Sequence, residues 1–316
     1  MKEEDFRQEK LKVLINKQLD PLDSTPINPY EIRNYVYYGF SCDELRPKYW
    51  KLMLNYFPTN KFKANEYYKS SRLGYHDIKI SENELIDKDI RRTDLLLKDG
   101  ELGDCAMPIK NILLKFEATN KAIGYVQGMI QIVIPIYYVL IKSKDLDEKK
   151  YAEEDAFYMF HNLMCEIYGV ETADFDNTLE GVQNKMKNIF ILLKTKDVEF
   201  HKILDEKGLL DTAFPFKWIM QLFTTIFKMP IIFNVWDKIL SDSYRFNILE
   251  YFCVVLLFFK KEELIEYSFE KCMEVIQNPG EIDFEKMFFI ADQLRRTNKK
   301  YQDVFNEYLE LKLKRL

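Results

Sequence analysis

Apolar residues recur at helical spacing along most of the chain. Residues 153–168 read EEDAFYMFHNLMCEIY, with a helical apolar stripe and an acidic first turn that suits the positive end of a helix dipole. Similar patterns cover residues 184–204, with a break near 194–197, and the C-terminal residues 301–316. No sustained alternation of apolar and polar positions is flanked by turn residues, as strands would require. The pattern predicts an all-α fold.

Capping residues indicate where several helices begin and end. Asn28, Pro29 and Glu31 fit an N-cap, a first helical position and a capping-box glutamate. Gly39 is a plausible stop for that helix. Residues 41–44 (SCDE) read as a second capping box before the helical run LRPKYWKLMLNYF.

Two apolar stretches need to be distinguished from membrane spans. Residues 125–141 contain Gln, Gly and Pro, and residues 246–259 are short and contain a Glu, whereas a span needs about 20 mostly apolar residues. Both are interpreted as buried helices. Two more helices are expected over residues 216–227 and 231–240, separated by Met229-Pro230.

Composition supports a globular helical protein. Of 316 residues, 47% are hydrophobic and 31% charged, which excludes a disordered chain. Only 10 Gly and 10 Pro are present, so long helices with short loops are expected. The net charge of -5, with both signs interspersed, gives no attraction to nucleic acid. Five cysteines without a CxxC pair, and no secretory signal, predict reduced thiols and a cytoplasmic location.

Other kinds of chemistry have little support in the sequence. His161 and Cys165 are four residues apart on one predicted helix, but no convincing third and fourth metal ligands accompany them. No GxSxG nucleophile motif or Walker-type phosphate loop is present, so the chain is not expected to bind nucleotide alone. Trp236-Asp237 lacks the repeat of about 40 residues that a WD propeller needs, and is interpreted as a core tryptophan and a helix aspartate.

Four short motifs occur in a fixed order. They are Gly39 with LRPKYWKLML (45–54), IDKDIRRT (86–93), GYVQGM (124–129), and FPFKW (214–218) with VWD (235–237). Together they resemble the landmark motifs of the TBC domain, a family that activates GTP hydrolysis by Rab-type small GTPases. The resemblance covers roughly residues 37–259. Stretches between residues 162 and 249 are similar to one subfamily of the animal TBC proteins, the one numbered thirteen.

The resemblance implies an all-α, two-lobed TBC domain over residues 37–260. Residues 1–36 would form an N-terminal extension with a short helix, and residues 261–316 a C-terminal helical extension packed on the domain. The implied partner is a Rab-type small GTPase in its GTP-bound state, and not nucleic acid. GTP and magnesium would belong to that partner, so the chain would need no cofactor or metal of its own. Membrane contact would be peripheral, through a Rab on endomembranes, in the regulation of membrane traffic.

The resemblance also implies the residues that carry the chemistry. An arginine supplied in trans stays protonated and forks onto two phosphoryl oxygens, while a glutamine amide can hold the attacking water. The family's two such residues correspond to Arg92 and Gln127, which are 35 positions apart in the sequence (127 − 92). Arg92 would lie at the edge of a helix-loop segment, with Gln127 where the next long helix begins. Residues expected to contact the GTPase are Asp89, Thr93, Tyr125 and Gly128.

Several alternatives remain open at this point. Arg91 competes with Arg92 for the role of the arginine, and Asp89 suits orienting an arginine or capping a helix better than acting as a base. The chain departs from the family pattern at Ile130, where Asn is usual, and at Lys217, where Arg is usual. A non-catalytic helical scaffold that binds a Rab is the alternative function. The presence of both Arg92 and Gln127 favours the activator.

Overall fold

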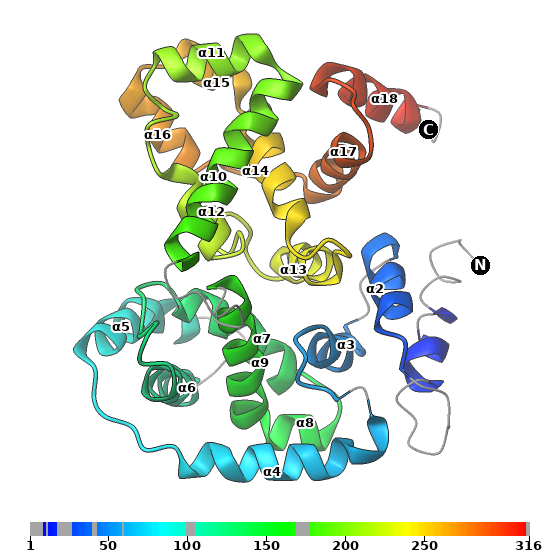
Figure 1. The fold of residues 1–316 in the computed structure, drawn as a ribbon, viewed down its shortest axis with the longest axis vertical. Coiled ribbons are helices and arrows are strands. Elements are labelled where there is room, and N and C mark those ends of the chain that lie inside the picture. The colour runs from blue at the N-terminus through cyan, green and yellow to red at the C-terminus, as the bar shows by residue number, and fades with distance from the viewer. Residues whose placement is uncertain are drawn as a thin grey trace. The chain divides into compact units, whose positions relative to one another are not determined.

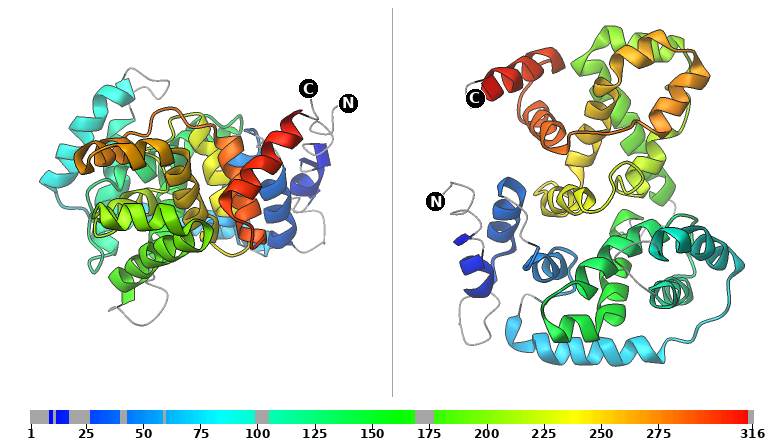
Figure 2. Two further views of the ribbon diagram at one scale, coloured as in Figure 1. Left: turned by 90° about the horizontal axis from the view of Figure 1, so that it is seen from above. Right: turned by 180° about the vertical axis from the view of Figure 1, so that it is seen from behind.

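The computed structural model describes residues 9–10, 12–17, 27–39, 43–58, 60–98, 105–168 and 177–313. Its regular elements are helices, and no strand occurs in these ranges. The chain forms two compact units, Met1–Ala173 and Asp174–Leu316, which are described separately. The predicted all-α fold is therefore confirmed (Figures 1 and 2).

The first unit is built around helices that pack on α9. Helices α6, α7, α4 and α8 each contact α9, and α5 packs on α6. Helix α4 runs along one edge of this unit in Figure 1 and in the right-hand view of Figure 2. The described helices are α2 (Pro29–Tyr38), α3 (Arg46–Met53), α4 (Ala64–Asp77), α5 (Glu84–Lys98), α6 (Ala106–Thr119), α7 (Ile130–Ile141), α8 (Leu146–Lys150) and α9 (Ala152–Ile167), with a 3-10 turn at Lys61–Lys63 and helical residues at 9–10 and 12–17.

Helix α2 begins and ends where its capping residues predict. The Asn28 side chain accepts a hydrogen bond from the Glu31 backbone N–H at 3.3 Å, and Pro29 occupies the first turn. A Cβ at Gly39 would lie 2.2 Å from the Tyr35 carbonyl oxygen, so only glycine fits against the last turn. The predicted capping box at residues 41–44 includes Ser41 and Cys42, which lie outside the described residues.

A buried ionic cluster ties α3, α4 and α9 together. The carboxylate of Asp155 is fully buried and receives two hydrogen bonds of 2.8 Å from the Arg72 guanidinium. The Lys51 ammonium lies 2.8 Å from the same carboxylate, and the Tyr56 hydroxyl donates to it at 2.8 Å. Because a buried charge is tolerated only when it is paired and hydrogen-bonded, the cluster fixes how these three helices pack.

The second unit is organised around the apolar helix α14. Helices α10, α12, α13, α15 and α17 contact it, and α18 packs on α17. The described helices are α10 (Asn177–Lys196), α11 (Val198–Glu206), α12 (Phe214–Met220), α13 (Ile231–Ser241), α14 (Asn247–Phe259), α15 (Lys261–Glu266), α16 (Phe269–Gln277), α17 (Phe284–Arg296) and α18 (Tyr301–Leu313). The break predicted near 194–197 is confirmed, because Asp197 caps α11 by accepting from the Phe200 N–H at 3.0 Å.

The helix predicted over residues 216–227 is wrong in its extent. Helix α12 ends at Met220, and Leu222 and Phe223 follow with φ of 48° and 63°. The indole of the buried Trp236 donates to the Leu222 carbonyl at 3.0 Å, and Phe223 is itself fully buried. These long-range contacts outweigh the local helical preference. Trp236 and Asp237 are both fully buried, as a core tryptophan and a helix aspartate.

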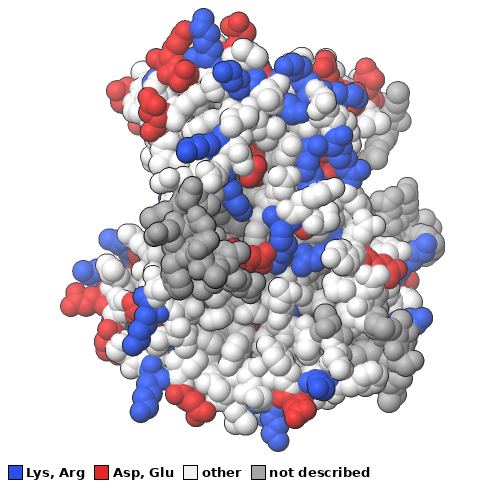
Figure 3. All heavy atoms as spheres, in the orientation of Figure 1, with Lys and Arg blue, Asp and Glu red and all other residues white. Residues whose placement is uncertain are grey.

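The apolar stretch over residues 246–259 is a buried helix, as predicted. The stretch over residues 125–141 is one only from Ile130 onward, because residues 125–129 form a loop. Most residues of α7 and α14 are buried, and no described helix is both long and apolar enough to cross a membrane. Lysine, arginine and acidic side chains are interspersed over the face drawn in Figure 3, as the sequence pattern predicts.

Candidate functional site

Helix α5, which carries the IDKDIRRT motif, is fixed at its start by an asparagine. The Asn83 side-chain oxygen accepts from the backbone N–H groups of Leu85 at 2.8 Å and Ile86 at 3.4 Å, which is N-cap geometry. The Asn83 amide donates to Glu117 of α6 at 2.6 Å, and Lys110 of α6 lies 2.8 Å from Asp87 of α5. Helix α5 is therefore held on α6.

The GYVQGM motif forms a tight loop between α6 and α7. The Asn120 carbonyl, at the end of α6, accepts from the N–H of Gly124 at 2.8 Å, and the Val126 carbonyl accepts from the Met129 N–H at 3.1 Å. Gly124 and Gly128 have φ of 66° and 94°, in the left-handed region that glycine adopts most readily. The two glycines let the chain turn twice within five residues, with Gln127 between them.

A single carboxylate joins this loop to α5. Asp89 is buried, and its Oδ2 atom accepts from the Tyr125 hydroxyl at 2.7 Å and from the Gly128 N–H at 3.1 Å. Its other oxygen, Oδ1, lies 3.7 Å from Nη1 of Arg92. Two motifs that are separated in the sequence thus meet at one side chain. From the sequence, Asp89 is expected to orient an arginine or to cap a helix, but its two short hydrogen bonds go to the loop, and Arg92 is the more distant contact.

Arg92 and Gln127 both belong to this cluster, and both are exposed. The Arg92 side chain is 68% exposed, and Gln127 is exposed at the tip of the loop. Arg92 lies in the interior of α5, which continues to Lys98, so its expected place at the edge of a helix-loop segment is wrong. Gln127 lies three residues before the start of α7, as expected. The competing Arg91 is exposed and forms no ion pair with a described residue.

The other expected contact residues divide into two groups. Tyr125 and Gly128 are partly exposed, whereas Asp89 and Thr93 are buried. The Thr93 hydroxyl donates to the Asp89 carbonyl at 2.8 Å within α5. Burial, and then the hydrogen bond to Asp89, raises the pKa of the Tyr125 phenol far above its usual range. A phenol is protonated at physiological pH even at its ordinary pKa of about 10, so the Tyr125 hydroxyl donates to the carboxylate there.

The sequence model of the Rab-GTPase-TBC domain matches residues 43–265, more than two thirds of the chain. The chain belongs to this family. The match contains Asp89, Arg92, Tyr125 and Gln127, so the cluster lies within the TBC domain.

Curated relatives support the same family. The chain is 34% identical over 170 residues to human and mouse TBC1 domain family member 13, covering 54% of this chain and 42% of each relative. It is 27% identical over 238 residues to the TBC domain-containing protein C1952.17c of Schizosaccharomyces pombe, covering 68% of this chain and 38% of that protein. The chain thus spans about four tenths of the length of these relatives.

Solved structures agree on the fold. The Ypt/Rab-GAP domain of Gyp1p superposes with a TM-score of 0.72 at 20% identity, covering 92% of this chain and 98% of that one. The Chlamydomonas flagellar RabGAP TBC domain gives a TM-score of 0.55 at 17% identity, covering 86% of this chain and 89% of that one. At these identities the likeness shows the fold alone.

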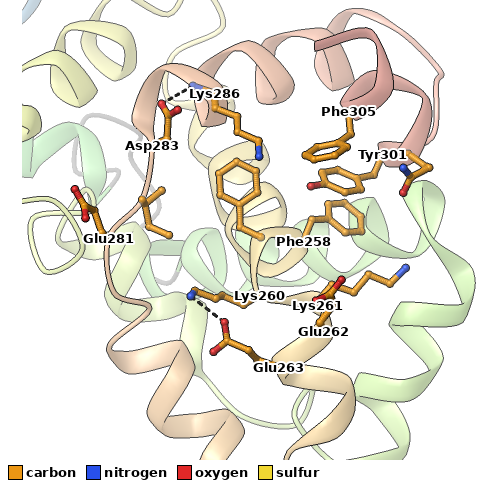
Figure 4. A pocket seen from close by; sticks show the side chains of 13 residues that line it. Phe258, Lys260, Lys261, Glu262, Glu263, Glu281, Asp283, Lys286, Tyr301 and Phe305 are labelled. Atoms are coloured by element: carbon orange, nitrogen blue, oxygen red, sulfur yellow. Dashed lines mark hydrogen bonds and ion pairs between the residues drawn. The ribbon is translucent and has the colours of Figure 1, made fainter. Parts of the chain in front are cut away.

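A separate cavity lies in the second unit and contains none of the predicted site residues. It has a volume of about 600 Å³ and is lined by residues of α14, α15, α17 and α18 (Figure 4). Several of its charged groups already have partners: Lys260 lies 3.0 Å from Glu263, and Lys261 lies 2.6 Å from Asp197. The Lys286 ammonium lies over the Phe305 ring, 4.5 Å from its centroid. The cavity shows no chemistry that matches the motifs.

The other residues that the sequence singled out are His161, Cys165, Ile130 and Lys217. The Sγ atom of Cys165 lies 3.8 Å from Nδ1 of His161, and the described residues hold no group of three or more His, Cys, Asp or Glu that could bind a metal. Ile130, where the family usually has Asn, is buried at the start of α7. Lys217 is exposed on α12 and forms no ion pair with a described residue, so it braces no carboxylate there.

Sequence reasoning missed how the cluster is supported. It did not identify Asn83 as the residue that caps α5 and joins it to α6, nor the Tyr125 hydroxyl as the group that binds Asp89. A signal for the first was available, because an asparagine directly before an acidic first turn is a common N-cap. No local signal pairs Tyr125 with Asp89, since the two are 36 residues apart.

Proposed function

We propose that this TBC domain accelerates GTP hydrolysis by a Rab-type small GTPase, to which it supplies Arg92 and Gln127. One observation carries the proposal. Asp89 binds the loop of Gln127 and lies beside Arg92, so one buried group positions both motifs while their two polar side chains stay exposed. The names of the relatives, which include a GTPase-activating protein of Saccharomyces cerevisiae that is 24% identical over 250 residues, support it.

The arginine would neutralise charge in the transition state. Its guanidinium keeps its proton at any physiological pH and can fork onto two phosphoryl oxygens. The ion pair with Asp89 is long, at 3.7 Å, and the arginine is mostly exposed, so little free energy opposes its release toward a partner. An arginine supplied in this way accelerates hydrolysis by roughly 10³–10⁵-fold.

The glutamine would hold the attacking water. Its amide can accept a hydrogen bond from water and donate one to the phosphate. The loop presents Gln127 between two left-handed glycines, and Asp89 binds the Gly128 N–H directly after it. A fixed backbone on both sides reduces the entropy lost when the amide is positioned.

In this proposal GTP and magnesium belong to the GTPase, which is bound in its GTP state. The TBC domain contributes side chains and performs no reaction on nucleotide alone. Asp89 and Thr93 support the site from within, whereas Tyr125 and Gly128 lie close enough to the surface to contact the partner. Membrane contact is peripheral, through a Rab on endomembranes, and the role is the regulation of membrane traffic from the cytoplasm.

The test is single-turnover GTP hydrolysis across a panel of purified Rab proteins. We expect stimulation of at least one Rab by the wild-type chain and a loss of about 10³-fold or more in Arg92→Ala, with Kd for the GTP-loaded Rab changed far less. Arg92→Lys should restore little, because a point charge cannot fork onto two oxygens. Gln127→Ala should also slow hydrolysis strongly, and a Rab whose own glutamine is replaced by Leu should still be stimulated.

The matched control is Arg91→Ala, the adjacent exposed arginine on the same helix, which should retain most of the activity. If both Arg92→Ala and Gln127→Ala retain activity, residues other than these two carry the chemistry. A wild-type chain that binds a Rab without stimulating it would identify the scaffold alternative. Calorimetry should detect no micromolar binding of GTP to the isolated chain, since nucleotide binding by the chain would contradict the partner's role.

A further inference from the structure

Two apolar side chains are exposed beside the two proposed catalytic residues. Leu85, seven residues before Arg92, is 55% exposed, and Val126, directly before Gln127, is 38% exposed. Single exposed apolar residues need no explanation. Here, however, each lies on one of the two segments that Asp89 joins, and neither has a part in the chemistry.

Helix geometry places Leu85 on the same face as Arg92. At about 100° per residue, a separation of seven positions brings two side chains to within about 20° of each other around the axis, and about 10 Å apart along it. Asp89 lies between them in height, turned about 40° from Leu85 toward the buried side. Because Asp89 binds the loop at Gly128, the loop that carries Val126 lies beside this face.

Both side chains are attached to backbone that is already fixed. The Leu85 N–H donates to the N-cap Asn83 at 2.8 Å, and the Val126 N–H donates to Met129 Sδ at 3.4 Å. An apolar group on an ordered backbone loses little conformational entropy when a partner covers it. These two residues are therefore suited to be buried in a complex.

We propose that Leu85 and Val126 form an apolar docking contact for the GTP-bound GTPase. The inference rests on the proposed function and deepens it: if Arg92 reaches the partner's nucleotide, the partner's surface beside that nucleotide must cover the adjacent part of α5 and the loop. The charges around the contact are balanced, because the exposed ammonium of Lys88 lies 3.8 Å from the exposed carboxylate of Glu84. The complementary surface is therefore apolar at the contact and needs no net charge.

The test compares Leu85→Ala and Val126→Ala with Leu73→Ala, a control at a leucine of α4 that is 61% exposed. Alanine is a better helix former than leucine, so Leu85→Ala should leave the fold intact. Burial of a leucine already half exposed predicts a rise in KM, and in Kd for the GTP-loaded Rab, of roughly five- to tenfold. The value of kcat should change less than about twofold, because the contact is the same in the ground and transition states. Leu73→Ala should behave as wild type.

Kd is measured in the Arg92→Ala background, so that binding is read without hydrolysis. If wild type stimulates a Rab and Leu85→Ala changes neither KM nor Kd, the docking contact is overturned while the proposed function stands. A fall in kcat with unchanged KM overturns it as well. If wild type binds a Rab without stimulating it, the proposed function fails, and a higher Kd for Leu85→Ala still supports the contact. Binding to no Rab of the panel overturns both.

Discussion

Replacing Asp89 by asparagine should disconnect the loop of Gln127 from α5 with little change in shape. The carboxylate now accepts from two donors, the Tyr125 hydroxyl and the Gly128 N–H, through one oxygen. An asparagine side chain is neutral, and one of its two terminal atoms is a donor, so it cannot reproduce a charged acceptor. The helix itself should persist, because the Thr93 hydroxyl bonds to the carbonyl of residue 89 and not to its side chain.

The magnitude follows from the number and kind of bonds lost. A hydrogen bond to a charged group contributes about 1.5–3 kcal/mol, and the asparagine oxygen can retain part of one, so the loop should lose about 2–3 kcal/mol of preorganisation. At about 1.4 kcal/mol per tenfold change, kcat/KM should fall roughly 30- to 140-fold. The ion pair between Asp89 and Arg92 is long, at 3.7 Å, and its arginine is mostly exposed, so it should add less than about 1 kcal/mol.

Asp89 should hold the loop of Gln127 more strongly than it holds Arg92, so a double-mutant cycle can test the mechanism. In the Asp89→Asn background, Gln127→Ala should add little, since the glutamine is already poorly positioned, whereas Arg92→Ala should still cost most of its full effect. The assay is single-turnover hydrolysis with a Rab that the wild-type chain stimulates. Tyr125→Phe keeps the ring and removes one of the two donors, so at about 1.5 kcal/mol it should reduce kcat/KM roughly tenfold.

Cooperative thermal unfolding of Asp89→Asn, with a midpoint close to that of Tyr125→Phe, would show that its loss of activity is local. The reasoning is refuted if a folded Asp89→Asn keeps kcat/KM within about threefold of wild type. It is also refuted if Gln127→Ala is fully additive to Asp89→Asn, because the loop would then be positioned by other contacts.

Three further predictions concern the stability of the fold. Burial opposes ionisation of Asp155, but Arg72 and Lys51 outweigh it and lower the pKa of its carboxyl. The stability that this carboxylate contributes above its unfolded pKa of about 3.9 should therefore be lost as the pH falls through the lower folded pKa. Asp155→Asn should be destabilised by about 3–5 kcal/mol, and its acid unfolding titration should lack this pH dependence. Asn83→Ala should cost about 1 kcal/mol in urea unfolding, through loss of the α5 cap. Gly124→Ala meets no atom within 4 Å but keeps a φ of 66°, so backbone strain alone should cost about 1–2 kcal/mol in the same assay.

Much of the fold could be predicted because its local signals agree with its tertiary contacts. Asn28 and Pro29 begin α2 as their chemistry requires, and Asp197 separates α10 from α11 as a cap. The shortened helix α12 shows where local signals fail. Nothing near Leu222 and Phe223 in the sequence indicates a left-handed backbone, which accompanies burial of Phe223 and a hydrogen bond from Trp236, 14 residues away.

The sequence names the candidate residues but not the contacts between them. The motifs point to Arg92 and Gln127 through resemblance, and the glycines on either side of Gln127 indicate a close approach of the backbone to a partner. The contact between Tyr125 and Asp89 depends on how α5 and α6 pack, which in turn depends on Asn83 and Glu117. Such pairings are set by tertiary structure, and one sequence contains no local pattern that specifies them.

The structure also accounts for the placement of one proposed catalytic residue on a helix and the other on a loop. An arginine has a long side chain, so Arg92 can extend from the interior of α5 while its backbone stays fully hydrogen-bonded within the helix. A glutamine side chain is shorter, and its backbone must therefore approach the partner more closely. Gly124 and Gly128, both at positive φ, allow that approach, and Asp89 limits the freedom that the glycines introduce by binding the Gly128 N–H. The buried carboxylate is thus needed more by the glutamine than by the arginine, which is why the loss of Asp89 should resemble the loss of Gln127.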